Sequence, residues 1–92
     1  MRQYKRFLFN KISYLNNLPN DLTKLFCSHN QIKKFQKLPN KLLVLNCYCE
    51  QMVNLDNLPK SVIELNIMKN RIINLDKIKN MNPNIKITYK YN

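Results

Sequence analysis

A Leu-Pro pair recurs along this chain at a fixed interval of twenty residues. The pairs are Leu18-Pro19, Leu38-Pro39 and Leu58-Pro59, so nothing has been inserted or lost between them. In units of twenty the sequence reads "LPNDLTKLFCSHNQIKKFQK", "LPNKLLVLNCYCEQMVNLDN" and "LPKSVIELNIMKNRIINLDK". A constant period of this length is typical of proteins in which one small unit stacks on the next, because such a unit cannot bury its own apolar face.

Apolar residues fall in the same columns of successive units. The columns hold Leu22, Leu42 and Val62; Leu25, Leu45 and Leu65; Cys27, Cys47 and Ile67; Ile32, Met52 and Ile72; and Phe35, Leu55 and Leu75. The same period places Phe7, Ile12 and Leu15 before the first full unit and Ile78, Ile85 and Ile87 after the third. Stacking brings like residues about 4.8 Å apart, so these columns predict one continuous core.

The repeated pattern, L-x-x-L-x-(L/C/I)-x-x-N-x-(I/M)-x-x-(F/L), resembles the leucine-rich repeat over roughly residues 4 to 89. Its "LP" pairs and short period are similar to a subclass known from bacterial effector proteins and also found in large DNA viruses of protists. The resemblance implies a right-handed solenoid, of the α/β horseshoe class by family but here mostly β. It implies a parallel sheet of four or five short strands on the concave face, an extended or irregular convex side, and little or no helix.

The repeat also sets the expected boundaries. A single domain spans 1–92, and it divides into a partial N-terminal repeat 1–17, full repeats 18–37, 38–57 and 58–77, and a partial C-terminal repeat 78–92. Strands are expected near 4–8, 24–28, 44–48, 64–68 and 84–88. Proline fixes φ and disfavours a helical residue before it, so each Leu-Pro pair predicts an extended convex corner, and no helix is expected to close the last coil.

One polar column follows from the resemblance. Asn10, Asn30 and Asn70 occupy the asparagine position of the family, whose side-chain amide bonds to the main chain of neighbouring coils. An amide both donates and accepts, so stacked asparagines can form a ladder. Glu50 interrupts this asparagine ladder. A carboxylate cannot donate, so we expect Glu50 to turn outward or to pair with a lysine or Arg71.

Alternate residues of the expected strands point away from the core and form the concave face. Aromatic and basic residues interleave there, a composition found at protein interfaces and compatible with stacked bases. The twenty-residue period places Lys86 beside Asn66 on this face. The expected partner-binding residues are Arg6, Lys24, Phe26, Asn46, Tyr48, Asn66, Met68 and Lys86.

Composition limits the functions that this chain can have. Glycine is absent, which removes the glycine-rich phosphate loops. His29 is the only histidine and has no acidic partner at a legible spacing, so we expect no enzyme. With Cys47 and Cys49 it makes too small a ligand set for a metal site, and we expect no cofactor. The odd number of cysteines, three, favours a reducing compartment.

Charge leaves a second function open. The net charge of +11 is compatible with binding nucleic acid or another polyanion, although A/T-rich codons would also supply many lysines, and the basic residues are dispersed along the sequence. The favoured interpretation is a non-enzymatic module that binds a partner protein through its concave sheet. We expect an intracellular protein, in the host cytoplasm or nucleus if the chain is viral, without a secretion signal or membrane anchor.

The ends of the repeat suggest a third function, a self-associating structural protein. A stack of repeats exposes the apolar cross-section of its first and last units unless a cap covers them. We expect a homodimer that pairs through the N-terminal edge strand. The residues expected at this edge are Tyr4, Phe7, Leu8 and Phe9.

Overall fold

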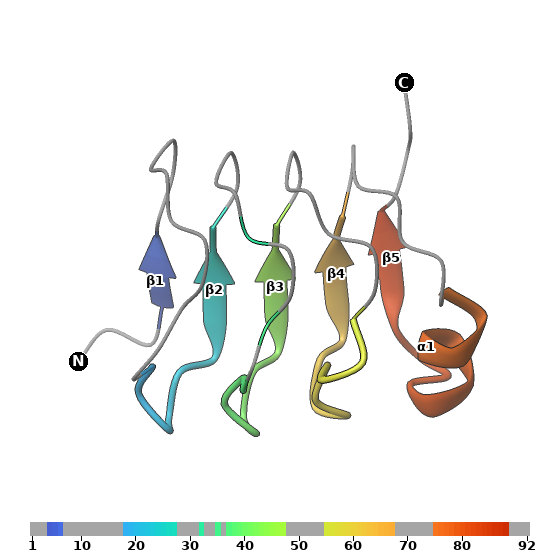
Figure 1. Ribbon diagram of the computed structural model, residues 1–92, viewed down its shortest axis with the longest axis horizontal. Helices are drawn as coiled ribbons and strands as arrows, with labels where there is room; N and C mark the ends of the chain where they lie inside the picture. The colour runs from blue at the N-terminus through green and yellow to red at the C-terminus, as the bar shows by residue number, and fades with distance from the viewer. Residues whose placement is uncertain are drawn as a thin grey trace.

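Five parallel strands form one sheet in the order in which they occur in the sequence (Figure 1). The computed structural model describes the backbone of residues 4–6 and, with side chains, residues 18–27, 32, 35, 37–47, 55–67 and 75–88. The strands are β1 (Tyr4–Arg6), β2 (Lys24–Phe26), β3 (Val44–Asn46), β4 (Glu64–Asn66) and β5 (Lys86–Thr88). The parallel sheet predicted from the repeat is therefore confirmed, with strands of three residues each.

The strands pair with a register that follows the sequence period up to β4. Lys24 lies opposite Val44, and Val44 lies opposite Glu64, each twenty residues further on. The last pair departs from the period, because Glu64 lies opposite Lys86, twenty-two residues further on. The strand expected at 84–88 therefore begins two residues late, and Ile87 rather than Ile85 takes the place next to Leu65.

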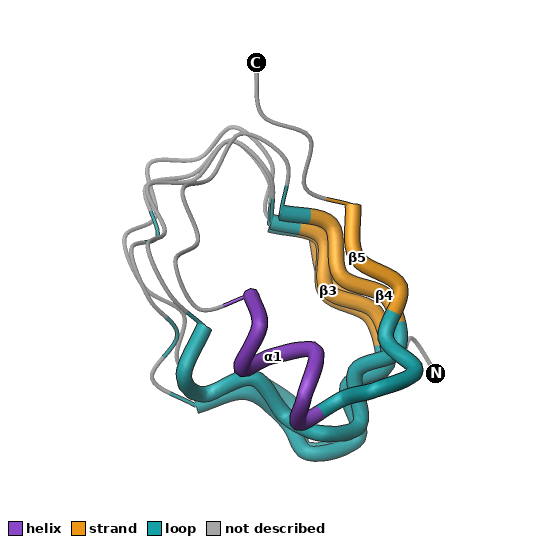
Figure 2. The backbone as a smooth tube through the Cα atoms, turned by 90° about the vertical axis from the view of Figure 1, so that its right-hand side faces the viewer, coloured by secondary structure: helices purple, strands orange, loops and turns teal. Residues whose placement is uncertain are grey.

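The extra residues belong to a helix, α1 (Leu75–Met81), at the β5 end of the stack (Figures 1 and 2). The expectation that no helix would close the last coil was wrong. A helix advances about 1.5 Å per residue and an extended chain about 3.3 Å, so a coil that contains a helix needs more residues to return to the sheet. Ile78 of α1 is buried, and Leu75 packs against the core beside it.

Local sequence explains why the helix forms and ends here. Asp76 lies in its first turn and Lys79 in its last, which complements the helix dipole. The N–H of Asn82 still donates to the carbonyl of Ile78, at 2.9 Å, and Pro83 then stops the helix. The sequence departs from the Leu-Pro pattern at this point, because the next Leu-Pro position reads Ile78-Lys79.

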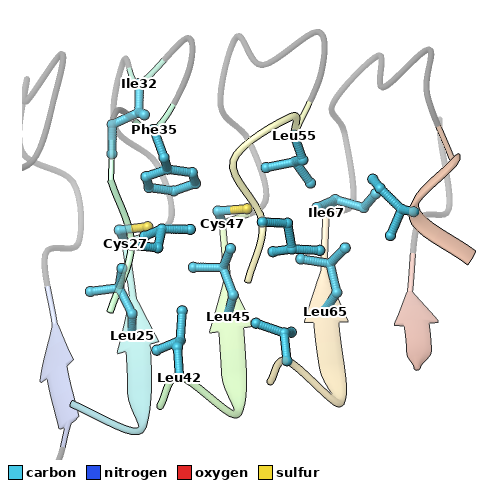
Figure 3. Packing of buried hydrophobic residues seen from close by; sticks show 14 of the residues in the cluster. Leu25, Cys27, Ile32, Phe35, Leu42, Leu45, Cys47, Leu55, Leu65 and Ile67 are labelled. Carbon is cyan, nitrogen blue, oxygen red and sulfur yellow. The ribbon is translucent and has the colours of Figure 1, made fainter. Parts of the chain in front are cut away.

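Most of the described core residues belong to the predicted columns, and Leu38 and Leu58 of the Leu-Pro pairs are buried with them. The side chains of Leu25, Leu45 and Leu65 point to the same side of successive strands (Figure 3), and each is at most 1% exposed. The remaining members of the buried cluster are Leu22, Cys27, Ile32, Phe35, Leu38, Leu42, Cys47, Leu55, Leu58, Val62, Ile67 and Ile78. Cys27 and Cys47 are buried and do not form a disulfide with each other. The predicted core positions Met52 and Ile72 lie outside the described residues.

Each Leu-Pro pair leads into the same turn. The carbonyls of Pro19, Pro39 and Pro59 accept the N–H of the third residue on, at 3.2, 3.2 and 3.3 Å. The donors are Leu22, Leu42 and Val62, which are all core residues. The turn therefore fixes where the chain re-enters the core just before each strand. In the last coil the turn is rebuilt from other residues, with the N–H of Ile85 donating to the carbonyl of Asn82 at 3.0 Å.

Among the described residues, the side chains of Asn57 and Asn82 bond to the main chain of a neighbouring coil. The Nδ2 of Asn57 donates to the carbonyl of Phe35 at 2.7 Å. The buried Nδ2 of Asn82 donates to the carbonyls of Pro59 and Val62 at 3.2 and 3.4 Å. Neither residue belongs to the predicted asparagine ladder, whose members Asn10, Asn30 and Asn70 lie outside the described residues, as does Glu50. These two amides therefore perform a coil-to-coil role at positions that the repeat pattern did not indicate.

Replacement of Leu45 by alanine should lower the free energy of unfolding by about 2–5 kcal/mol, because it removes a side chain with no exposed surface from the middle of the core. Leu43→Ala is the matched control, since it makes the same change two residues earlier, where the side chain is 40% exposed. Urea denaturation of both variants measures the difference. Equal losses of stability would contradict the assignment of inward and outward positions.

Replacement of Asn82 by aspartate should also destabilise the fold, by about 1–3 kcal/mol, because it removes the donor to two main-chain carbonyls and buries a carboxylate against them. Asn84→Asp is the control, since Asn84 is exposed two residues away. The comparison is made by thermal or urea denaturation at neutral pH. Equal stability of the two variants would show that Asn82 does not hold the last coil.

Candidate functional site

The solvent side of strands β2 to β5 carries a shallow hollow with a volume of about 180 Å³. We call this side the sheet face; it is formed by the first and third residue of each strand. The middle residues Leu25, Leu45 and Leu65 point into the core, so their neighbours alternate to the opposite side. The hollow is lined by Phe26, Val44, Leu45, Asn46, Glu64, Leu65, Asn66, Lys86 and Thr88.

Strand register arranges the sheet face in two rows. The first row is formed by Lys24, Val44, Glu64 and Lys86, and the second by Phe26, Asn46, Asn66 and Thr88. The backbone of β1 extends these rows with Tyr4 and Arg6 respectively. Each row crosses the sheet at the spacing of neighbouring strands, about 4.8 Å. Side chains far apart in the sequence therefore lie next to one another on one surface.

Five of the predicted partner-binding residues lie on this face with their side chains described. They are Lys24, Phe26, Asn46, Asn66 and Lys86. Lys86 was expected beside Asn66, but the displaced register of β5 puts it beside Glu64 and puts Thr88 beside Asn66. For Arg6 the structure describes the backbone alone, and the predicted residues Tyr48 and Met68 lie outside the described residues.

The first row carries charges of both signs. Lys24, Glu64 and Lys86 are exposed, and the half-buried Val44 lies between the first two. At strand spacing, the three charges lie within about 15 Å along the row. A ligand that follows this row meets a cation, an apolar side chain, an anion and a cation in that order. The row therefore presents a pattern of both charges rather than one sign of charge.

From β2 to β5 the second row carries no charged side chain. It begins with the aromatic ring of Phe26 and continues with polar residues. Phe26, Asn46 and Asn66 are half-buried. The main-chain carbonyls of Asn46, Asn66 and Thr88 accept the N–H groups of Cys27, Cys47 and Ile67 at 2.9, 2.8 and 2.8 Å. These bonds hold the third residue of each strand at a fixed position. Amides both donate and accept, so this row suits a ligand with main-chain or other amide groups.

Two exposed apolar residues border the sheet face and were missed by the sequence analysis. Leu43 is 40% exposed and Ile63 is 52% exposed, directly before β3 and β4. The N–H of Ile63 donates to the carbonyl of Leu43 at 2.8 Å, so the two residues are stacked on adjacent coils. Both occupy positions that vary between repeats. A large apolar residue at the same position of two successive units is the sequence pattern that could have identified them.

The lysines of the described residues do not gather on one surface. Lys24 and Lys86 lie on the sheet face, and Lys41 and Lys60 lie in the turns that precede β3 and β4. Lys77 belongs to α1 and forms an ion pair with Asp56, with 3.9 Å between Nζ and Oδ1. A protein that binds nucleic acid through its charge needs a continuous basic stripe. The described lysines named here are instead divided between the sheet face, the turns before the strands and α1.

The described residues contain neither a metal-binding cluster nor a membrane-spanning helix. No three His, Cys, Asp or Glu side chains there lie close enough together to hold a metal ion. His29 and Cys49, which the sequence analysis considered with Cys47, lie outside the described residues. No helix in the described part of the chain is long and apolar enough to cross a membrane.

Comparison of the chain with protein-family models, with curated proteins and with solved structures found no match.

Proposed function

We propose that this chain is a leucine-rich-repeat solenoid that binds a partner protein through the sheet face and has no enzymatic activity. The observation that carries the proposal is the hollow over β2 to β5, which is lined by side chains from four consecutive coils. The twenty-residue period and the in-register parallel strands support the solenoid, since they place one strand per repeat along a single axis.

The chemistry of the sheet face favours a protein as the ligand. It combines an aromatic ring, two amides and charges of both signs, as protein interfaces do. Phe26 is half-buried at one end of the hollow, where an aromatic side chain can contribute more binding energy than its neighbours. Leu43 and Ile63 add exposed apolar area at the margin of the same face.

The sheet face supports a catalytic function less well than it supports protein binding. Glu64 is the only carboxylate among the described residues that line the hollow, and general acid-base chemistry on a sugar or peptide commonly uses a second titrating group in contact with the substrate. Lys86 lies in register with Glu64, but both side chains are exposed. The buried residues Cys27 and Cys47 do not form a disulfide, which supports the further proposal that the protein works in a reducing compartment inside the cell.

Site-specific photo-crosslinking in lysate of the source cells tests this proposal. A photoreactive phenylalanine in place of Lys24, on the sheet face, should capture a partner protein, and the same residue in place of Lys37 should not. Both lysines are exposed and belong to the same repeat, so they form a matched pair. Addition of Glu64→Lys to the Lys24 probe should reduce capture because it replaces the only anion of the first row by a cation. Equal capture from both positions would contradict the proposal.

The net charge of +11 keeps polyanion binding as a second candidate, and salt dependence separates the two. We expect the chain to bind random-sequence DNA only in the non-specific range, with a Kd of roughly 10⁻⁴–10⁻⁶ M at physiological salt. A double variant on the sheet face, Lys24→Gln with Lys86→Gln, should then weaken DNA binding no more than a control double variant away from it. The control is Lys37→Gln with Lys79→Gln. A larger loss and a shallower salt slope for the first pair alone would favour a polyanion site on the sheet face.

A further inference from the structure

The described residues cover the β5 end of the stack only in part. Ile87 lies next to Leu65 in the core column. It is only partly buried, whereas the side chains of Leu45 and Leu65 are 0% and 1% exposed. Ile85 is partly buried as well. Four exposed residues of α1 are polar, as on a capping unit, whereas Met81 at its end is apolar and 41% exposed. The polar residues are Asp76, Lys77, Lys79 and Asn80. Within the described part of the chain, α1 therefore covers only the part of this end against which it packs. It does not pair with the outer edge of β5.

The main chain of β5 has an outer edge that no other described strand pairs with. The N–H of Lys86 donates to Ile63 and the carbonyl of Thr88 accepts from Ile67, both at 2.8 Å and both toward β4. Successive residues of a strand direct their main-chain groups to opposite sides, so the N–H and carbonyl of Ile87 face the open edge. Such an edge is a template for another strand.

The opposite edge of the sheet is less suited to pairing. Lys5 of β1 takes the register position that Leu25 and Leu45 occupy in the next strands. Two copies that paired through antiparallel β1 strands centred on this residue would set one Lys5 directly against the other, which is unfavourable. A head-to-tail pair of β1 with β5 would place Lys5 beside Ile87 in the core column. Lysine at such a position protects an edge from pairing.

The geometry points to a second copy of this chain as the occupant of the β5 edge. We propose an antiparallel pair of β5 strands with a two-fold axis at Ile87, which exchanges both main-chain hydrogen bonds with its counterpart. The two isoleucines then meet on the core side of the joined sheet. On the sheet face, Lys86 lies opposite Thr88 of the second copy, so no like charges are directly opposed. This dimer differs from the N-terminal one expected from the sequence, and it does not depend on the proposed function.

Sedimentation equilibrium of the full chain, from micromolar to millimolar concentration, tests the dimer. The mass should rise from 11.1 kDa toward twice that value and no further. Thr88→Lys places a lysine opposite Lys86 of the second copy, and symmetry does so twice. The dimer Kd should therefore rise roughly 2- to 30-fold, and Thr88→Glu should lower it by a similar factor. Thr88 is exposed, so neither variant disturbs the core.

Asn40→Lys and Asn40→Glu are the controls. They make the same changes of net charge at an exposed turn residue away from β5, and they should leave the dimer Kd unchanged. A monomer at every concentration would overturn the proposal. A dimer whose Kd responds equally to the changes at Thr88 and Asn40 would place the interface elsewhere, and a mass that grows beyond two chains would show head-to-tail stacking instead.

Discussion

The contact between Leu25, Leu45 and Leu65 on adjacent strands is the interaction on which the rest of the structure depends. Each side chain is at most 1% exposed, and burial of one leucine stabilises a fold by about 1.5–3 kcal/mol. None of these residues could be buried within its own coil. Because their side chains point inward, the residues on either side of each leucine point outward, and the same contact that forms the core also sets out the two rows of the sheet face.

The sequence predicts the core and the outward rows because the constant length of the repeat determines the strand register. Where successive units have equal length, residues twenty apart must lie opposite each other, and Leu42, Leu45 and Cys47 could be assigned to the core from their columns alone. The prediction failed in the last coil, where α1 replaces an extended segment and the interval grows to twenty-two. Seven helical residues contain too short an apolar pattern to be distinguished from the preceding coils before their contacts are known.

The candidate site was predictable to the same extent. Lys24, Phe26, Asn46 and Asn66 follow from strand alternation, whereas the neighbour of Lys86 could be identified only from the structure, since it depends on the displaced register. The identity of the proposed partner cannot be predicted in this way. Its identity depends on a surface that this chain does not contain, and a repeat fold supports many unrelated partners. The mixed charges of the first row and the exposed Leu43 and Ile63 describe the surface that the proposed partner would have to complement.

Main-chain nuclear Overhauser contacts of the isotope-labelled chain test the central claim, which is a parallel stack with one change of period. The account predicts contacts between strands at a separation of twenty residues from β2 to β4, and at twenty-two between β4 and β5, with Leu65 next to Ile87. Contacts at twenty throughout, with Leu65 next to Ile85, would contradict the role given to α1. Close Hα–Hα contacts between strands would indicate antiparallel pairing and would contradict the stack itself.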